Sequence, residues 1–591
     1  MTNESSVDER SKGDRNGDEL VAEAKQGETG TRVGIRADTQ RRRVLNGLAL
    51  VGFVLPVAFL FWLIHIDAVN MLRADQWDAI RLIQQSDSGK LSLGVLWAQH
   101  TENRIFFQNL ITLLLAHTTN FNILVEDYVS GALLVAAAAV LVVTHRRRSP
   151  SRPWIFYCPV VIVMLSAAVW GVTLFGFQIG WSLIMLSLAG TLFLLDRPRV
   201  TGLVLAAAVA AAVVGSFSSL EGLIIWPAGL VLLCQRHRSR RQILAWSCAA
   251  LATAGLYFHN WTGGGNQTFY AFAHPIAGAK FFFFAIGDVV GVQTYNTSSS
   301  DDVFVEILGV VIVTIALWVV ITYGFRRDET SGRPLGVSLI WFGLLFAVAI
   351  TAARSSNGLS AAAASRYTLF DLLIVVGSYL VVIDRPEPAF RVGRRRQLLP
   401  VMSAVVLAVT GLQIVVGTSE GLINAQTYHQ FQLVGADVTV NIDHAPVAPV
   451  ETYLASGQTV SYIQRMTAFA RAHRLAMFST AAAAVYAKEG LPKTPPATNV
   501  TSPYDGETLK GPQWLLAAAT DEYGVSKVEF DFTGKGRGST LIGPAALIKF
   551  GWIDRWSTAS VPDGTYTLRS VAYGASGGVS SSPGVVVHVE N

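Results

Sequence analysis

Residues 41–66 read RRRVLNGLALVGFVLPVAFLFWLIHI, in which three arginines precede 23 residues without Asp, Glu, Lys or Arg. A helix that crosses a membrane needs about 20 mostly apolar residues. Basic residues beside such a helix mark its cytoplasmic end. The stretch therefore predicts a first transmembrane helix that leaves the N-terminus in the cytoplasm.

Ten further apolar runs of similar length follow the first. They cover 126–145, 153–175, 178–196, 200–217, 219–235, 242–259, 302–324, 335–353, 367–384 and 398–417. Basic clusters occur at Arg41–Arg43, Arg146–Arg152, Arg197–Arg199, Arg236–Arg241, Arg326–Arg327 and Arg391–Arg396. With eleven spans, all six clusters fall on the cytoplasmic side. The chain is predicted to be an α-helical polytopic membrane protein with an extracytoplasmic C-terminus.

Two shorter apolar stretches, 105–116 and 278–292, do not fit this count as spans. The first is too short, and if either crossed the membrane every later loop would change sides. We expect both to lie at the outer interface or to re-enter the membrane.

The composition agrees with a membrane protein and excludes other classes. Of the 591 residues, 51% are hydrophobic and 15% are charged, and the mean hydropathy is +0.41. These values exclude a soluble enzyme, a disordered protein and a nucleic-acid-binding module. The net charge of +5 reflects topology and not a polyanionic partner. Residues 1–43 hold nine acidic and nine basic residues and are predicted to be a disordered cytoplasmic tail.

The C-terminal part of the chain changes character twice. Residues 418–497 are predicted to be extracytoplasmic, with a helical stretch around 458–488 and a proline-containing linker. Residues 498–591 hold six or seven short β-rich runs separated by turn residues, which predicts a β-sandwich. The segment WIDRW followed by VPDGTYTLRSVAYGASG resembles bacterial immunoglobulin-like modules. Its acids are scattered through predicted turns and form no catalytic cluster, so we expect a binding or spacing role.

Residues 44–417 form the predicted transmembrane domain. Within it, the predicted exterior loop 67–125 carries a group of polar residues. Asp75 and Asp78 lie three residues apart, so in a helix both carboxylates share one face. His100, Glu102 and Arg104 follow just before the short apolar stretch. The two acids can equally be solvated, or paired with neighbouring arginines, and the other three can be structural.

These residues also carry a family resemblance. Ala74-Asp-Gln-Trp-Asp78 and Gln99-His-Thr-Glu-Asn-Arg-Ile105 resemble the Asp-Asp-Trp-Asp-like and His-Asn-Glu-His-Arg-like motifs of bacterial GT-C glycosyltransferases. Gln76 stands at the second acidic place, Thr101 at the Asn place and Asn103 at the second histidine place. The chain layout over 44–417 is also similar to that superfamily.

The resemblance implies transfer of a sugar from a polyprenyl-phosphate donor to a glycan, lipid or protein acceptor of the cell envelope. Asp75 aligns with the leading acid and is expected to act as the base, with Asp78 as a helper or metal contact. The only candidate cofactor is a divalent metal, Mg²⁺ or Mn²⁺. Because Gln76 interrupts the acidic pair, the sequence leaves metal dependence open.

Four other residues are candidates for substrate contacts. Arg354 and Arg366 flank one short exterior loop and are expected to bind the donor phosphate. Both can instead extend to lipid headgroups. Glu221 and Gln178, with His100, Glu102 and Arg104, are candidates for the substrate pocket. Glu221 can also be an interface residue, and Gln178 can serve only to satisfy backbone groups in a tight hairpin.

The sequence leaves three function classes open. The first is a glycosyltransferase at the outer face of a bacterial plasma membrane. The second is a lipid-linked glycan flippase or another transporter, and the third is a scaffold for envelope assembly. A transporter should have ionisable residues near the bilayer midplane, whereas the acids here collect in exterior loops.

Overall fold

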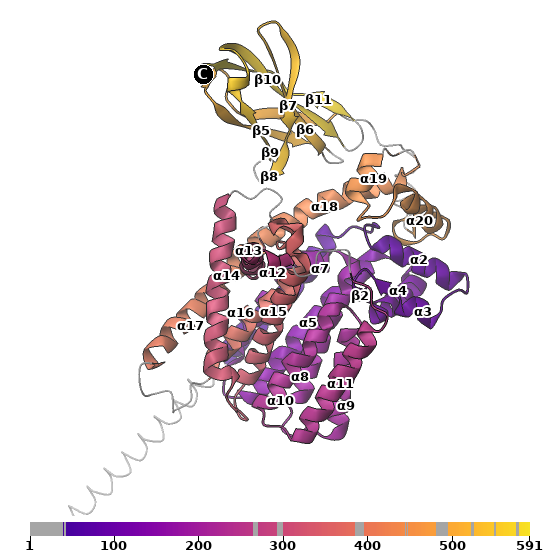
Figure 1. The fold of residues 1–591 in the computed structure, drawn as a ribbon, viewed down its shortest axis with the longest axis vertical. Helices are drawn as coiled ribbons and strands as arrows, with labels where there is room; N and C mark the ends of the chain where they lie inside the picture. The colour runs from indigo at the N-terminus through magenta and orange to yellow at the C-terminus, as the bar shows by residue number, and fades with distance from the viewer. Residues whose placement is uncertain are drawn as a thin grey trace, which may run out of the picture.

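The computed structural model is mostly helical and ends in a β-rich region (Figure 1). It describes residues 40 and 43–591, except 264–269, 292–298, 385–394, 444, 446, 480–494, 522–524, 549–550 and 575–577. The predicted cytoplasmic tail therefore lies almost wholly outside the described residues, as does the C-terminal part of the helix predicted around 458–488.

Eight helices in the described part of the chain are long and apolar enough to cross a membrane. They are Arg43–Asp67, Ile123–Arg148, Trp154–Thr173, Gly176–Leu195, Val303–Gly324, Arg333–Asn357, Ser365–Ile383 and Leu399–Val440. Three more predicted segments are also helical, as α9 (Gly202–Ser216), η4–α10 (Leu220–Gln235) and α11 (Arg240–Phe258). The fold class of an apolar helical protein is confirmed, and the count of eleven spans stays a prediction.

The bundle includes the α-helices α5 (Ile123–Arg148), α8 (Ile179–Leu195), α14 (Ser299–Val319), α15 (Arg333–Arg354) and α16 (Ser365–Ile383). Other parts of the bundle depart from regular α-helix. Residues 154–173 are broken into η1 (Trp154–Tyr157), α6 (Cys158–Met164), η2 (Ala167–Val169) and α7 (Trp170–Thr173). A π-helical turn, η6 (Val320–Gly324), ends α14, and another, η10 (Gln413–Gly417), joins α17 (Arg395–Leu412) to α18 (Thr418–Val440).

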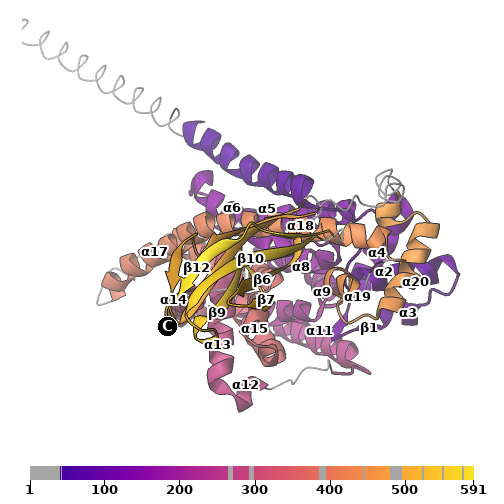
Figure 2. The same cartoon turned by 90° about the horizontal axis from the view of Figure 1, so that it is seen from above.

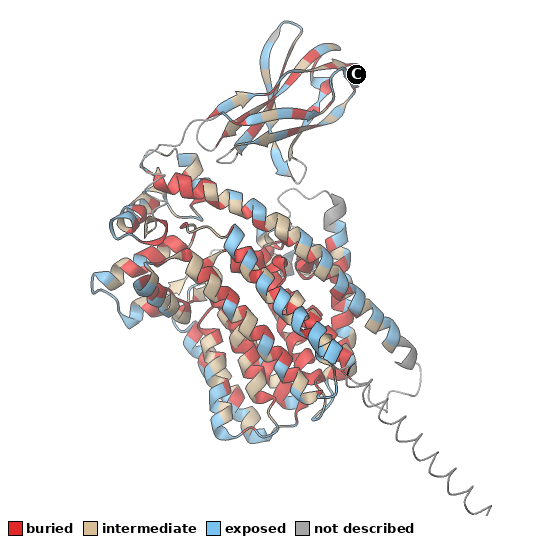
Figure 3. Cartoon of the chain, turned by 180° about the vertical axis from the view of Figure 1, so that it is seen from behind, coloured by how far each residue is buried: buried red, intermediate tan, exposed pale blue. Residues whose placement is uncertain are grey.

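The bundle core lies where these helices face one another (Figure 3). Helices α15 and α16 approach closely at Gly336 and Gly377. A Cβ on either glycine would lie 2.5 Å from the carbonyl oxygen of the other. Small residues permit such contacts between apolar helices. The first long helix, Arg43–Asp67, lies at the edge of the bundle (Figure 2).

Polar contacts stabilise the bundle at the end where Arg148 and Arg236, from two of the basic clusters, lie. The buried carboxylate of Asp196 accepts from Arg236 at 2.7 Å and from Arg148 at 2.9 Å. Arg236 also donates to the carbonyl oxygens of Asp328 and Ser331, at 2.8 and 2.9 Å. One acid thus connects α5 and α10 to the loop before α15.

A second, smaller core lies at the other end of the bundle. It is shared by α2 (Gln76–Asp87), α3 (Leu93–Trp97), α4 (Phe106–Thr119), α19 (Val447–Tyr453) and α20 (Val460–Ala472). We call residues 68–122 and 428–479 the cap subdomain (Figure 2). The exterior loop and the segment after the last predicted span therefore fold together.

Neither of the two short apolar stretches is among the helices long enough to cross a membrane. The first forms α4, which belongs to the cap subdomain. The second forms α13 (Pro275–Gly287), which packs against α14. A Cβ on Gly287 would lie within 2 Å of the carbonyl oxygen of Val305, so the two backbones touch there.

The C-terminal region is a two-sheet β-sandwich with its own core. One sheet has the order β4-β12-β10-β6-β7 with β11 paired to β10, and the other has the order β3-β5-β9-β8. The strands are β3 (Ala497–Ser502), β4 (Glu507–Leu509), β5 (Pro512–Thr520), β6 (Val525–Gly534), β7 (Arg537–Pro544), β8 (Ala546–Ile548), β9 (Gly551–Ser557), β10 (Gly564–Gly574), β11 (Val579–Ser581) and β12 (Val585–Val589). Phe532 and Trp556 stack at 5.2 Å in the core, and the hydroxyl of Tyr566 donates to Pro562 at 2.6 Å. The predicted β-rich module is confirmed.

We expect Asp196→Ala to lower the free energy of unfolding by about 3–5 kcal/mol, because it leaves two arginines facing a buried site without their counter-charge. The matched control is Asp443→Ala, which removes an exposed pair with Arg471 at 2.8 Å and should cost less than about 1 kcal/mol. Reversible unfolding of the detergent-solubilised protein measures both. Equal losses in the two variants would contradict a structural role for Asp196.

Candidate functional site

Two acids lie at the start of helix α2. Asp75 occupies the N-cap position and Asp78 the first turn, where negative charge is favoured by the helix dipole. Ala74, directly before them, has φ of 49°, a left-handed conformation that costs a non-glycine residue about 1–2 kcal/mol. Its N–H donates to the carbonyl oxygen of Leu454 at 2.8 Å. This contact with the second half of the cap subdomain holds the turn that orients both acids.

A short hairpin brings His100 to these acids. It consists of β1 (Gln99–His100) and β2 (Asn103–Arg104). Nε2 of His100 lies 3.5 Å from Oδ1 of Asp75, and Nδ1 lies 3.9 Å from Oδ2 of Asp78. The imidazole therefore lies between the two carboxylates.

Asp75, Asp78 and His100 can hold a metal ion. One ligand atom from each lies within 4.8 Å of the other two. Their side chains are 33%, 26% and 17% exposed, which leaves room for water ligands. Two carboxylates with one imidazole suit Mn²⁺ or Zn²⁺, whereas Mg²⁺ prefers an all-oxygen shell. Of the two predicted metals, the donor set fits Mn²⁺ better.

Tyr462 of α20 fixes the orientation of Asp78. Its hydroxyl donates to Oδ1 of Asp78 at 2.7 Å. Burial and this hydrogen bond raise the pKa of Tyr462 well above its usual range. The phenol therefore stays protonated at physiological pH and remains a donor. One carboxylate oxygen of Asp78 is held by Tyr462, and the other faces His100.

Arg104 is buried in the hairpin and has backbone partners. Its guanidinium donates to the carbonyl oxygens of Tyr257 at 2.6 Å and Trp97 at 2.9 Å, and also to that of His259. Its carbon Cζ lies 5.3 Å from the Trp97 ring centre. The structure thus places Arg104 as an anchor for the hairpin, outside the cavity wall described below.

Glu102 and Arg354 form an ion pair. Glu102 lies in the hairpin turn, and Arg354 is the last residue of α15. The backbone carbonyl of Glu102 also accepts from the indole N–H of Trp261 at 2.9 Å. Two predicted site residues from different groups therefore contact each other.

Glu221 and Arg366 belong to a second polar group next to the hairpin. The side-chain oxygen of Asn103 accepts from the Ser219 hydroxyl and from the Leu220 N–H, both at 3.0 Å. The Ser219 hydroxyl also lies in hydrogen-bond contact with Glu221. Arg366 lies within electrostatic range of both Glu221 and Asp75. Arg366 is thus the cation that Asp75 of the α2 turn and Glu221 of η4 have in common.

Arg366 has a close partner in its own helix. Its guanidinium donates to the hydroxyl of Tyr367 at 3.3 Å and lies 4.8 Å from the ring centre. By contrast with Arg354, Arg366 has no direct carboxylate partner among the ion pairs of the described residues. Its positive charge therefore remains the more available of the two for an anionic ligand.

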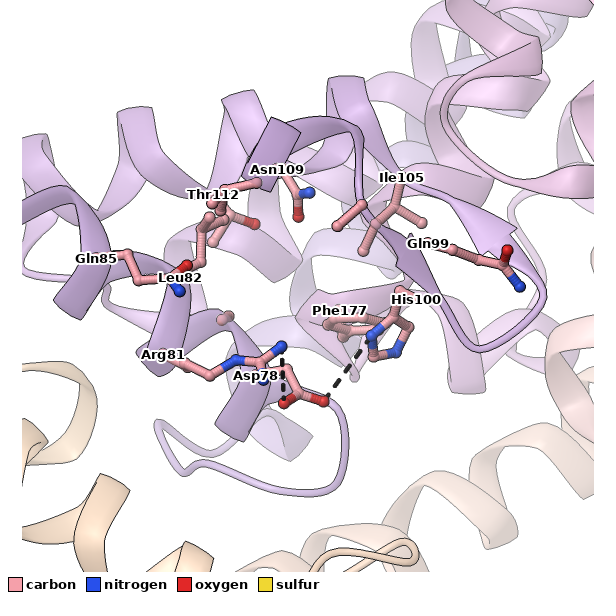
Figure 4. A pocket seen from close by; sticks show the side chains of 13 residues that line it. Asp78, Arg81, Leu82, Gln85, Gln99, His100, Ile105, Asn109, Thr112 and Phe177 are labelled. Atoms are coloured by element: carbon pink, nitrogen blue, oxygen red, sulfur yellow. Dashed lines mark ion pairs between the residues drawn. The ribbon is translucent and has the colours of Figure 1, made fainter. Parts of the chain in front are cut away.

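A cavity of about 190 Å³ opens beside Asp78 (Figure 4). Asp78 and Arg81 of α2 lie on one side, and Asn109 and Thr112 of α4 on the other (Figure 4). His100 contributes to the wall, with its ring centre 5.3 Å from that of Phe177. Gln178 follows Phe177 in η3 (Gly176–Gln178), directly before α8, and does not line the cavity.

Sequence reasoning missed several of these residues, and only some had a detectable pattern. Asp78 and Gln85 both line the cavity and are seven residues apart, which is the spacing of one helix face. Asn109 and Thr112 of α4 also line the cavity, and their spacing of three residues likewise puts them on one helix face. Tyr462 had no such pattern, because its partner lies 384 residues away.

Comparison with known families finds one match. Residues 496–569 match a family model described as a bacterial Ig domain. The match covers β3 to most of β10 and agrees with the observed sandwich. Neither the curated proteins nor the solved structures contain a match to the chain. The comparisons thus identify the C-terminal module as a bacterial Ig domain.

We expect Tyr462→Phe and Asp78→Ala to couple in a double-mutant cycle by about 1.5–3 kcal/mol, because a hydrogen bond to a charged acceptor is worth that much. Reversible unfolding of the four proteins measures the coupling. Tyr453→Phe is the matched control, since Tyr453 packs on Phe431 at 4.8 Å in the same subdomain. Equal coupling of both tyrosines to Asp78 would contradict the hydrogen bond.

Reversing the charge of either Glu102 or Arg354 should lower thermal stability, because each single change places like charges in contact. The double exchange Glu102→Arg with Arg354→Glu should recover most of that loss. A double exchange no more stable than the worse single variant would show that the pair does not hold the hairpin on α15.

Proposed function

We propose that this chain is an integral membrane glycosyltransferase of the GT-C type. It transfers a sugar from a polyprenyl-phosphate donor to a glycan, lipid or protein acceptor at the outer face of a bacterial plasma membrane. The observation that carries the proposal is the meeting of Asp75, Asp78 and His100 at one end of an apolar bundle, with Arg366 within electrostatic range of Asp75. This places a proton acceptor and a cation for a phosphate in one site.

The charge distribution supports a site on the outer side of the membrane. Among the described residues, Arg148 and Arg236 of the basic clusters lie at the bundle end that Asp196 fastens. The acids of the cap subdomain lie at the opposite end (Figure 1). Under the positive-inside rule, the cap subdomain faces outward. The bacterial Ig domain, which follows the cap subdomain in the chain, fits a bacterial envelope protein.

The chemistry requires one acid and one cation. The acceptor hydroxyl oxygen forms a bond to the anomeric carbon as the bond from that carbon to the phosphate oxygen breaks. The polyprenyl phosphate leaves with the electron pair of the broken bond, and a carboxylate of the Asp75–Asp78 pair receives the hydroxyl proton. Arg366 stabilises the negative charge of the leaving phosphate. A metal bound by the acids and His100 would supply further charge stabilisation there.

Two buried acids bear on the transporter alternative. Asp127 of α5 and Asp371 of α16 have no hydrogen-bond partner for either carboxylate oxygen among the described residues. At 1.5 Å per residue they lie only about 6 and 9 Å from the starts of their helices. The midpoints of these helices are farther along, so neither acid is at the centre of the bundle. Their positions favour surface chemistry over passage through the middle.

We expect Asp75→Asn and Asp78→Asn, in a strain that lacks the native gene, each to lower transfer by about a hundredfold or more, because a catalytic carboxylate contributes that much. The measurements are envelope glycan composition and transfer by the purified protein from polyprenyl-phosphate sugars. Asp87→Asn is the matched control, because Asp87 is an exposed acid at the end of the same helix.

Protein levels must be equal in all three strains. Wild-type glycan in both site variants would contradict the catalytic proposal and favour a role as a scaffold for envelope assembly. Loss of glycan together with loss of the lipid-linked sugar from the outer leaflet would favour a flippase. Accumulation of that sugar in the outer leaflet would favour the transferase.

A further inference from the structure

The cavity beside Asp78 is large enough for one sugar ring. Its volume is about 190 Å³, more than ten times the roughly 10–15 Å³ that one water molecule needs. The wall comes from α2, α3, β1 and α4 of the cap subdomain, with Phe177 added from the bundle.

The polar groups of the wall suit a neutral, hydroxylated ligand. The side-chain amides of Gln85 and Asn109 each offer donors and acceptors, as sugar hydroxyls require. Asp78 and Arg81 have opposite charges 3.9 Å apart, so their fields largely cancel. An anionic ligand would meet the carboxylate of Asp78 without a free cation on the wall. The ring of Phe177 provides an apolar surface for the C–H face of a sugar.

The position of the cavity separates the roles of the two acids. Helices α2, α3 and α4, which supply most of the wall, are not among the described helices long enough to cross a membrane. Asp78 is on its wall and Asp75 is not. Asp75 instead lies within electrostatic range of Arg366, in the first turn of the span helix α16. One acid lines the cavity, and the other lies outside its wall.

We propose that this cavity is the acceptor subsite, that it binds one neutral monosaccharide ring, and that Asp78 receives the proton of the acceptor hydroxyl. The assignment rests on the proposed transferase function. The family resemblance gives the role of base to Asp75, whereas the cavity wall gives it to Asp78. Tyr462 donates to Oδ1 of Asp78 at 2.7 Å and so orients the carboxylate, while Oδ2 lies 3.9 Å from Nδ1 of His100.

The test uses the full chain in nanodiscs and methyl glycosides of hexopyranoses and pentofuranoses, with saturation-transfer NMR as the readout. At least one methyl glycoside should bind. Gln85→Ala should weaken that binding about three- to tenfold, the value of one lost hydrogen bond. Gln84→Ala, the neighbouring residue off the cavity wall, should leave it unchanged. Asn109→Leu, a change on the opposite wall of the cavity, should also weaken the binding.

Three outcomes would overturn the assignment: no methyl glycoside binds at millimolar concentration, binding is equal in the Gln85, Asn109 and Gln84 variants, or only glycoside phosphates bind. Binding that depends on Gln85 in a protein without transferase activity would refute the proposed function and keep the sugar site. Full transfer by the Gln85 and Asn109 variants would refute the subsite and keep the function.

Discussion

The buried guanidinium of Arg104 is the contact on which the site depends. A charge removed from water is costly unless its hydrogen bonds are replaced, and here three carbonyl groups replace them. They belong to Trp97, Tyr257 and His259, which come from two distant parts of the chain. The donors of a guanidinium have fixed directions. The hairpin that carries Arg104 therefore cannot shift without leaving several of these groups unpaired.

The other hairpin residues each hold a different part of the molecule. His100 faces the acids of α2, and Glu102 pairs with Arg354 of α15. Asn103 binds the start of η4, while Gln99 accepts from the N–H of Thr262 at 3.0 Å. Six consecutive residues thus connect the cap subdomain to three segments of the bundle. The carboxylate pair and Arg366 belong to different subdomains, and this hairpin holds them in range of each other.

The sequence predicted the parts of this arrangement that depend on neighbours in the chain. Apolar runs, basic clusters and the turn residues of the sandwich are local patterns, and the corresponding helices and strands are observed. The three-residue spacing of Asp75 and Asp78 also sufficed to place both on one helix face. The sequence did not predict the ion pair between Glu102 and Arg354. These residues are far apart in the chain, and we expected each of them to contact substrate. Nor did the sequence predict a role for Tyr462, which it placed outside the membrane domain.

The sequence by itself determined the apolar helices, the C-terminal sandwich and the residues capable of chemistry. Helix length, hydropathy and turn formation are set within a few residues of chain, so a linear pattern records them. Only the tertiary structure decided which polar residues contact one another, which donate hydrogen bonds to backbone carbonyl groups, and which line a cavity. These outcomes depend on how separate helices pack, and packing joins residues such as Asp78 and Tyr462 that share no local pattern.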